Sequence, residues 1–142
     1  MKVKGFTIVE VLIVIAIIAI LLNLMMLSVK GFQNEARVSH VRADLRTLQI
    51  AIEAYSKNHF TYPPVENYQT VLLAEPSRVL DENLLDPFVA SGAILYGYTL
   101  SLDESYYIIY SIGIKKDGSV TLDNAGNVSA EGSAIYVTNG RG

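Results

Sequence analysis

One carboxylate interrupts an otherwise uncharged, strongly apolar run near the start of this 142-residue chain. Glu10 is the only formal charge in residues 6–29, and the next charge along the chain is Lys30. A charged side chain is costly in hydrocarbon, and where a membrane segment keeps one it usually has a function. Glu10 is therefore the first candidate for a functional side chain.

The other polar residues do not suggest a catalytic arrangement. His40 is expected on the exposed side of a helix and His59 at its end, and neither has a serine or a carboxylate at a suggestive spacing. The acidic residues of segment 81–86 are more typical of a solvated face than of an acid/base pair. The chain has no cysteine, which excludes disulfides and thiolate metal sites. These features favour a protein that is not an enzyme.

The apolar run is long enough to cross a membrane. At about 1.5 Å per residue, a helix over residues 6–29 covers a hydrocarbon core about 30 Å thick. Lys2 and Lys4 precede it, which predicts a cytoplasmic N-terminus and an exported C-terminal part. The run could be a secretory signal peptide, an uncut signal anchor, or an anchor that loses a short basic leader. It is too long for a signal peptide, and no convincing small-x-small cleavage site follows it.

The helix is expected to continue beyond the anchor. Apolar residues recur three or four positions apart over residues 38–55, which predicts one helix over 6–58 with an apolar stripe on its second half. Glu53 and Lys57 are spaced for an i,i+4 ion pair. The prolines of segment 62–64 end the helical region.

The rest of the chain predicts a small antiparallel sheet that packs on this stripe. Residues 59–93 are expected to be irregular, with a short helical piece near residues 67–74. Three or four strands are predicted, at 94–102, 106–112, 119–122 and, more weakly, 134–138. The nine tyrosines are expected to pack mainly as cross-strand pairs on the helix. The predicted fold class is α+β: a long N-terminal α-helix, with a membrane-spanning half and an amphipathic half, against a 3–4-stranded sheet.

The segment Lys4-Gly5-Phe6-Thr7-Ile8-Val9-Glu10 resembles the class III signal of type IV prepilins and type II secretion pseudopilins. The resemblance covers the basic leader, the glycine, the phenylalanine, the glutamate and the long apolar helix. It implies cleavage between Gly5 and Phe6 by the prepilin peptidase, followed by N-methylation of Phe6. Gly5 has no side chain, so the backbone there can lie flat in a protease groove.

The later features of the chain, in their order, resemble the major pseudopilin of type II secretion and its disulfide-free pilin relatives. These features are Tyr62-Pro63, Asp86-Pro87-Phe88, Tyr96-Gly97-Tyr98, and the run from Tyr107 to Asp117-Gly118. The spacing between Pro87 and Tyr96 is longer than in that group, and its tryptophan-rich ending is absent. This part of the match is one of pattern rather than identity.

The resemblance implies a structural subunit of a type IV pilus-like or type II secretion pseudopilus filament, polymerised through its N-terminal helix. Its implied partners are copies of itself in a helical filament, the prepilin peptidase, an inner-membrane assembly platform with its ATPase, minor pilins or pseudopilins, and the membrane before assembly. In stacked helices Glu10 would face the Phe6 ammonium group of a neighbour, and this pairing would relieve two desolvation penalties.

The expected domain division is a leader at 1–5, a transmembrane and filament-core helix at 6–29, and an exported pilin-like head at 30–142. The head would consist of helix 30–58, the irregular segment 59–93 and the sheet 94–138. The expected location is the bacterial inner membrane, crossed once with the N-terminus cytoplasmic, and then a periplasmic or extracellular filament.

The charge balance gives no sign of nucleic-acid binding. The formal net charge of −3 becomes −5 from side chains once Lys2 and Lys4 are removed with the leader, and no basic stripe is present. A monomeric, membrane-anchored exported binding module, with a ligand on the tyrosine-rich sheet, remains the alternative function. Cleavage and fibre formation separate the two, because such a module would stay uncut in the membrane.

The resemblance implies one cofactor, calcium, which major pseudopilins hold in a C-terminal loop. The residues here that carry suitable oxygens are Asp117, Ser119, Asp123, Asn124 and Asn127. Calcium takes about six to eight oxygen ligands from a flexible loop. A plain turn followed by a polar loop would use the same residue types, and the spacing matches no fixed calcium motif. Both interpretations stay open at this point.

Overall fold

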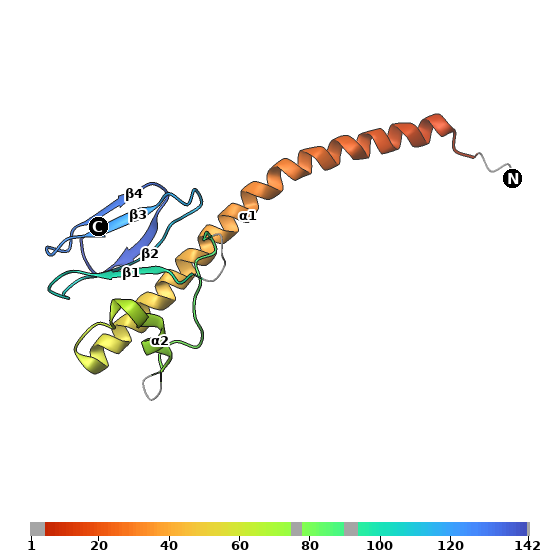
Figure 1. The fold of residues 1–142 in the computed structure, drawn as a ribbon. Helices are drawn as coiled ribbons and strands as arrows, with labels where there is room; N and C mark the ends of the chain where they lie inside the picture. The colour runs from red at the N-terminus through yellow and green to blue at the C-terminus, as the bar shows by residue number, and fades with distance from the viewer. Residues whose placement is uncertain (1–4, 75–77, 90–93, 142) are drawn as a thin grey trace. The chain divides into compact units, whose positions relative to one another are not determined.

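The computed structural model describes residues 5–74, 78–89 and 94–141. In chain order these residues form helix α1 (Ile8–His59), the 3-10 turn η1 (Val65–Asn67), helix α2 (Tyr68–Leu73) and five strands (Figure 1). The chain divides into two compact units, Met1–Ala36 and Arg37–Gly142. Helix α1 matches the expected long helix closely, since residues 6–58 were predicted and Ile8–His59 are observed.

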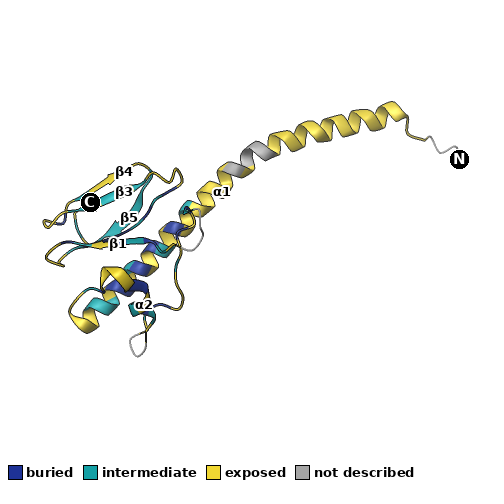
Figure 2. Cartoon of the chain, viewed as in Figure 1, coloured by how far each residue is buried: buried dark blue, intermediate teal, exposed yellow. Residues whose placement is uncertain are grey.

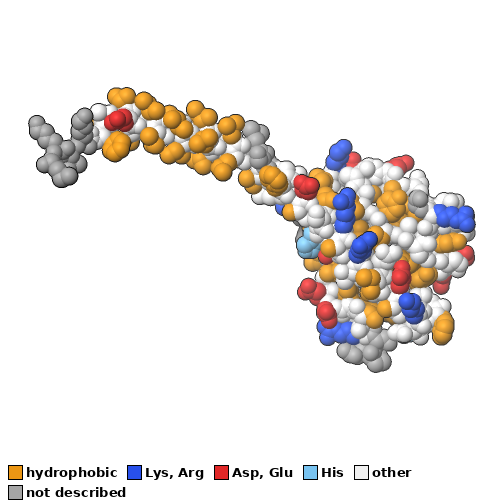
Figure 3. All heavy atoms as spheres, turned by 180° about the vertical axis from the view of Figure 1, so that it is seen from behind, with side chains coloured by type: hydrophobic (Ala, Val, Ile, Leu, Met, Phe, Trp, Pro, Cys, Tyr) orange, Lys and Arg blue, Asp and Glu red, His pale blue; other side chains and the backbone are white. Residues whose placement is uncertain are grey.

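The first unit consists mainly of the N-terminal part of α1, and none of its residues with a described side chain is buried. Residues Ile8–Met25 have a mean hydropathy of 3.0 and none of them is buried (Figure 2). Hydrophobic side chains cover this part of the helix in the space-filling view (Figure 3). The segment is long and apolar enough to span a membrane.

The second unit, Arg37–Gly142, has its own hydrophobic core, and the predicted stripe of α1 forms one side of it. Four stripe residues spaced four, three and four apart are fully buried: Val41, Leu45, Leu48 and Ile52. Val38 and Tyr55, at the two ends of the stripe, pack against the core and are partly buried. The amphipathic half of the predicted helix is therefore confirmed.

Three strands form an antiparallel sheet in the order β1-β2-β5. They are β1 (Gly97–Leu100), β2 (Tyr107–Ser111) and β5 (Ile135–Thr138). The central strand β2 is almost entirely buried. Tyr96, Tyr98 and Tyr107 join the α1 stripe in one core cluster. The predicted α+β class is confirmed.

Two further strands form a separate antiparallel pair, β3 (Ser119–Leu122) with β4 (Val128–Glu131). The three-stranded sheet agrees with the predicted three or four strands, but the predicted strand at 119–122 lies outside it and pairs with β4, which was not predicted. Strand β4 is short, and three of its four residues, Ala130 among them, are exposed, so its burial does not alternate. Its pairing depends on the turn after β3, where the Gly126 N–H donates to the Asp123 carbonyl oxygen.

Two buried polar side chains organise the irregular segment between helix and sheet. The Gln69 side chain, on the predicted helical piece α2, accepts from the Leu84 N–H at 2.8 Å and donates to the Leu84 carbonyl at 3.0 Å. Asp86 accepts from the N–H of Phe88 through Oδ1 and from that of Ile112 through Oδ2. The segment is therefore fixed to α2 and to the end of β2 by hydrogen bonds rather than by regular structure.

The tyrosines contribute mainly to the core, but their closest partners differ from the expected ones. Tyr68 packs on Tyr98 with ring centroids 4.7 Å apart, and Tyr62 packs edge-on against Tyr107 at 5.0 Å. Each pair joins the irregular segment to a strand rather than one strand to the next. Burial raises the pKa of Tyr68 to about 12, so its hydroxyl stays protonated and donates to the Tyr96 carbonyl.

Candidate functional site

Gly5 and Phe6, the first two residues that the structure describes, are open to solvent within this chain. A Cβ atom built on Gly5 would meet no other atom within 4 Å, and Phe6 is 85% exposed. Residues 1–4 of the predicted leader lie outside the described residues. The packing of the chain itself does not require glycine at position 5, so any such requirement would come from a binding partner.

Thr7 and Glu10 form a reciprocal cap at the start of α1. The Thr7 N–H and hydroxyl donate to Glu10 Oε2 at 2.8 and 2.9 Å, and the Glu10 N–H donates to Thr7 Oγ1 at 3.3 Å. This arrangement is the capping box, in which the residue before the helix and the third helical residue satisfy each other's free backbone N–H groups. This role of Thr7 and Glu10 was not predicted from the sequence, although Thr-x-x-Glu before an apolar run is the known signal of a capping box.

Phe6 directly precedes this capping box. It occupies the position before the cap, and Val11 occupies the fourth helical position, which are the two positions of a hydrophobic staple. Phe6, Glu10, Val11 and Val14 line a shallow hollow of about 310 Å³. The predicted cleavage residue and the predicted assembly residue therefore share one surface, at the end of the exposed apolar helix.

The Glu10 carboxylate can accept more hydrogen bonds than it has. An ionised carboxylate offers about four acceptor positions on two oxygens. Thr7 occupies only Oε2. A cationic group of a partner, such as an amine, could therefore bind at Oε1 without breaking the cap. In a low-dielectric environment such a pair would be strongly favoured over an isolated carboxylate.

The residues predicted to bind calcium lie in separate loops. Asp117 precedes β3 and Asp123 follows it, and six residue steps of extended chain cover roughly 20 Å. Calcium–oxygen distances are about 2.3–2.6 Å, so one ion cannot bind both carboxylates. Ser119 is the first residue of β3 and is exposed, and Asn124 Oδ1 accepts from the Leu102 N–H at 2.8 Å.

Each carboxylate instead closes its own loop. Asp117 Oδ1 accepts from the Ser133 hydroxyl at 2.7 Å and its N–H at 2.9 Å, and these bonds lower the pKa of Asp117. Asp123 accepts from the Asn127 side-chain amide and N–H at 2.8 and 2.7 Å, and its pKa is lowered for that reason. The five residues do not fit a single calcium ion as a set. Calcium binding at either loop remains an untested prediction.

The two histidines bind groups of the chain itself. His40 Nδ1 lies 3.0 Å from Asp44 Oδ2, which also accepts from the Tyr96 hydroxyl at 2.7 Å. The prediction that His40 has no carboxylate at a suitable spacing is wrong, because i,i+4 residues are neighbours on a helix. His59 Nδ1 lies 3.1 Å from the Tyr55 carbonyl oxygen. Throughout the described ranges, no three His, Cys, Asp or Glu residues are placed to hold a metal ion.

Residues 1–22 match the family model described as the prokaryotic N-terminal methylation motif. The chain is also similar to type II secretion system core protein G of Pseudomonas aeruginosa, with 27% identity over 74 residues, and to that of Klebsiella michiganensis, with 31% over 74 residues. Each match covers 52% of this chain and 52% of the relative. The chain thus spans about half the length of the curated relatives it matches. No solved structure matches it. The resemblance inferred from the N-terminal heptapeptide is confirmed.

Proposed function

We propose that this protein is the subunit of a type II secretion pseudopilus, a filament assembled from many copies of the chain. The observation that carries this proposal is the methylation motif at residues 1–22, which opens an apolar helix with no buried residue over Ile8–Met25. The similarity to type II secretion system core protein G favours the secretion branch over a retractile pilus.

Processing would begin with cleavage between Gly5 and Phe6 by the prepilin peptidase, and Phe6 would then be N-methylated. The open surroundings of Gly5 leave the backbone accessible to a protease. The capping box between Thr7 and Glu10 lies entirely after the cut, so the helix start would survive processing.

The apolar helix would first hold the chain in the inner membrane and later form the filament core. Lipid tails are as apolar as leucine. A helix that leaves the bilayer for a bundle of like helices is therefore stabilised by van der Waals packing and gains little hydrophobic free energy. Register would therefore depend on a specific contact. Glu10 of one copy would bind the Phe6 amine of the next copy through Oε1, while Thr7 keeps Oε2.

The proposed partners follow from this cycle: the peptidase, an inner-membrane assembly platform with its ATPase, and minor pseudopilins. Lys2 and Lys4 favour a cytoplasmic N-terminus, so the head would be exported and the filament would stand in the periplasm or beyond.

N-terminal sequencing and mass spectrometry of the purified protein test the proposal. We expect a chain that begins at N-methylated Phe6 and fibres visible by negative-stain electron microscopy. A chain that begins at Met1 and stays in the membrane fraction without fibres would favour the membrane-anchored binding module instead. A Gly5→Leu variant is the matched control, because it should block cleavage while leaving the fold unchanged.

A further inference from the structure

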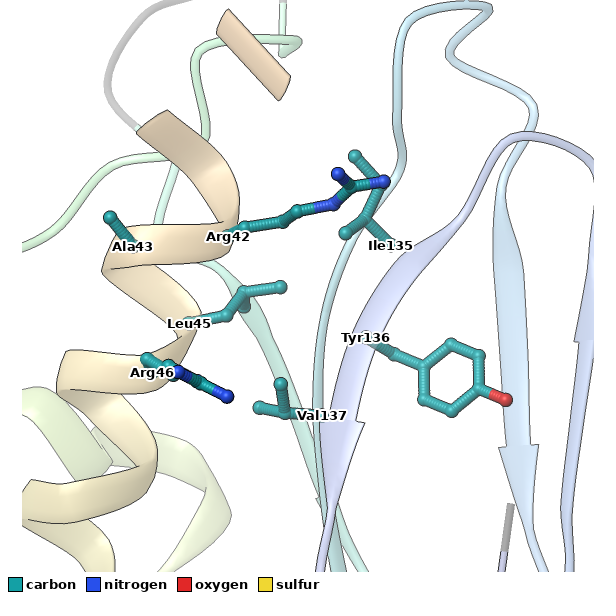
Figure 4. A pocket seen from close by; sticks show the side chains of 7 residues that line it. All are labelled: Arg42, Ala43, Leu45, Arg46, Ile135, Tyr136 and Val137. Carbon is teal, nitrogen blue, oxygen red and sulfur yellow. The ribbon is translucent and has the colours of Figure 1, made fainter. Parts of the chain in front are cut away.

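A groove with an apolar floor and a basic rim lies in the second unit, between α1 and β5. We call it the α1–β5 groove; it has a volume of about 570 Å³ and is formed by Arg42, Ala43, Leu45, Arg46, Ile135 and Val137. The two arginines extend from the helix toward the strand, and Tyr136 points away from the helix (Figure 4). Leu45 is fully buried beneath them. The groove therefore fits an apolar side chain that is accompanied by negative charge.

The basic rim is not neutralised by the chain itself. In the part of the chain that the structure describes, neither Arg42 nor Arg46 forms an ion pair. Asp44, the carboxylate between them in sequence, is already bound by His40 and Tyr96. Arginine binds carboxylates through a planar, often two-pronged set of donors. Two free guanidinium groups one helical turn apart thus favour an acidic partner.

The turn between β1 and β2 has the complementary character. We call residues 101–106 the β1–β2 tip. Leu102, at its outer end, is 91% exposed, and the exposed carboxylates of Asp103 and Glu104 follow it directly. A single exposed leucine needs no explanation by itself. An exposed leucine beside two carboxylates, however, is complementary to the groove. The leucine suits the apolar floor, and the carboxylates carry the charge opposite to that of the two arginines.

The β1–β2 tip is held in one conformation before any contact forms. The Leu102 N–H donates to Asn124 Oδ1 at 2.8 Å. The Ser101 hydroxyl donates to Asp103 Oδ1 at 2.6 Å, and the Glu104 N–H donates to the Ser101 carbonyl at 2.9 Å. A preorganised loop loses little conformational entropy when it binds.

A copy cannot fill its own groove with its own tip. The tip joins β1 to the Tyr107 end of β2, whereas the groove lies on β5, whose residues Ile135 and Val137 pair with Ser111 and Ile109 of β2. These positions are two to four residue steps along β2 from Tyr107, roughly 7–13 Å. A contact between copies that joins two different surfaces is heterologous, and a heterologous contact that does not close into a ring extends into a helical filament.

We propose that the β1–β2 tip of one copy occupies the α1–β5 groove of the next copy, with Leu102 on the apolar floor and Asp103 and Glu104 against Arg42 and Arg46. This inference rests on the proposed filament function and adds the contact between heads. The head contact would add a second specific contact to the proposed Glu10–Phe6 pair, since the remaining side chains of the apolar helix specify neither direction nor spacing.

Cysteine cross-linking in assembled fibres tests the contact, and the absence of native cysteine makes introduced pairs unambiguous. We expect a chain carrying both Leu102→Cys and Ala43→Cys to give a ladder of disulfide-linked multimers on a non-reducing gel. A control pair, Phe60→Cys with Ala43→Cys, replaces a side chain that is equally exposed at 92% and should give no ladder. Fibres that give no ladder with the first pair, or equal ladders with both pairs, overturn the proposal.

Charge reversal gives an independent measurement that does not need new disulfides. We expect Glu104→Arg alone and Arg46→Glu alone each to lower the yield of sheared fibre at least about tenfold, and the double variant to recover most of it. Lys116→Glu, at an exposed charge that belongs to neither surface, should leave the yield unchanged. Single variants with wild-type yield, or a double variant without recovery, overturn the contact.

The two proposals fail in different ways. A wild-type chain that is uncut and forms no fibres overturns the filament function and the head contact together. Wild-type fibres without the expected cross-link and without charge rescue overturn the head contact alone.

Discussion

At the scale of single residues, Glu10 shows how one carboxylate can cap a helix and keep one oxygen available to a partner. Its Oε2 accepts two hydrogen bonds from Thr7, so the group is not left without partners near the end of an apolar helix. A buried or membrane-embedded carboxylate without such bonds would be far more costly. The capping box therefore keeps the carboxylate in place, with its second oxygen still able to accept.

Gln69 is the residue whose loss should most clearly destabilise the head. The change Gln69→Leu replaces the side-chain amide by an apolar group of similar size, and it leaves the Leu84 N–H and carbonyl without their partners. Two unsatisfied backbone groups should lower the free energy of unfolding by about 2–4 kcal/mol. Denaturant unfolding of the full chain in detergent, followed by tyrosine fluorescence, measures this change.

Thr70→Leu is the matched control, because Thr70 is the exposed neighbour on the same short helix. An exposed substitution of this kind should change the unfolding free energy by less than about 0.5 kcal/mol. Equal midpoints for the two variants would show that the Gln69 hydrogen bonds do not stabilise the fold.

The sequence predicts candidate residues most readily where they lie together in one short segment. Gly5, Phe6 and Glu10 follow each other within one short motif, and the capping signal Thr-x-x-Glu lies in the same segment. Gln69 and Asp86 also bind backbone groups 15 and 26 residues away, and no local pattern indicates these two contacts. Glu53 was expected to pair with Lys57, but it accepts from the Tyr107 hydroxyl, 54 residues away, at 3.1 Å.

At the scale of elements, the β3–β4 hairpin is closed by a carboxylate, and this should make it sensitive to acid. The pKa of Asp123 is lowered from its ordinary value of 3.8, chiefly by the Asn127 hydrogen bonds. A lowered folded-state pKa gives stability that is fully present above the ordinary value and is lost as the pH falls below it. Between about pH 4 and pH 2, the melting temperature of Asp123→Asn should therefore decrease less than that of the wild type.

Thermal melts at matched ionic strength measure this difference. The control is Asp81→Asn, since Asp81 is an exposed carboxylate on a surface loop and forms only a long ion pair of 3.7 Å with Arg78. It should follow the wild-type acid curve. A wild-type curve that runs parallel to that of Asp123→Asn would contradict the role of the carboxylate.

The loops closed by Asp117 and Asp123 also predict how the stability of the protein responds to calcium. Asp117 and Asp123 bind Ser133 and Asn127 within the chain, so the loops are closed without an ion. We expect the melting temperature of the full chain to be the same with excess chelator as with millimolar calcium. A rise in the presence of calcium, absent in Asp123→Asn, would show that the ion replaces these hydrogen bonds.

The elements that sequence could predict are those whose burial follows a period. The α1 stripe over residues 38–55 and the runs that became β1, β2 and β5 have apolar residues facing one core. Strand β4 has no such face, because it pairs with β3 away from that core. Its existence depends on the preceding turn and on register with Ser119–Leu122. The turn and the register depend on tertiary contacts, which the local amino-acid composition does not specify.

At the scale of the whole molecule, the head and the apolar helix differ in whether they need a binding partner to bury their apolar groups. Within the described ranges, every buried side-chain nitrogen or oxygen has a hydrogen-bond partner, so the head needs no neighbour to complete its core. The segment Ile8–Met25 buries nothing and must find lipid or other helices. If assembly joins such segments, whatever specificity the segments themselves contribute to stacking has to come from the few groups on them that are not apolar.

Glu10→Leu tests that conclusion on the complete chain. The change leaves Gly5, Phe6 and the length of the apolar helix intact, so cleavage and membrane insertion should continue. Fibres should be lost, because the neighbour's Phe6 amine would be left without its carboxylate in a low-dielectric core. N-terminal sequencing measures the first outcome and electron microscopy of sheared fibres the second.

Glu10→Leu also removes the cap, and Thr7→Val separates the two effects, since it weakens the helix start by about 1 kcal/mol but keeps the carboxylate. Fibres in Thr7→Val and none in Glu10→Leu would assign assembly to the charge, whereas a normal yield in Glu10→Leu would contradict the proposed role.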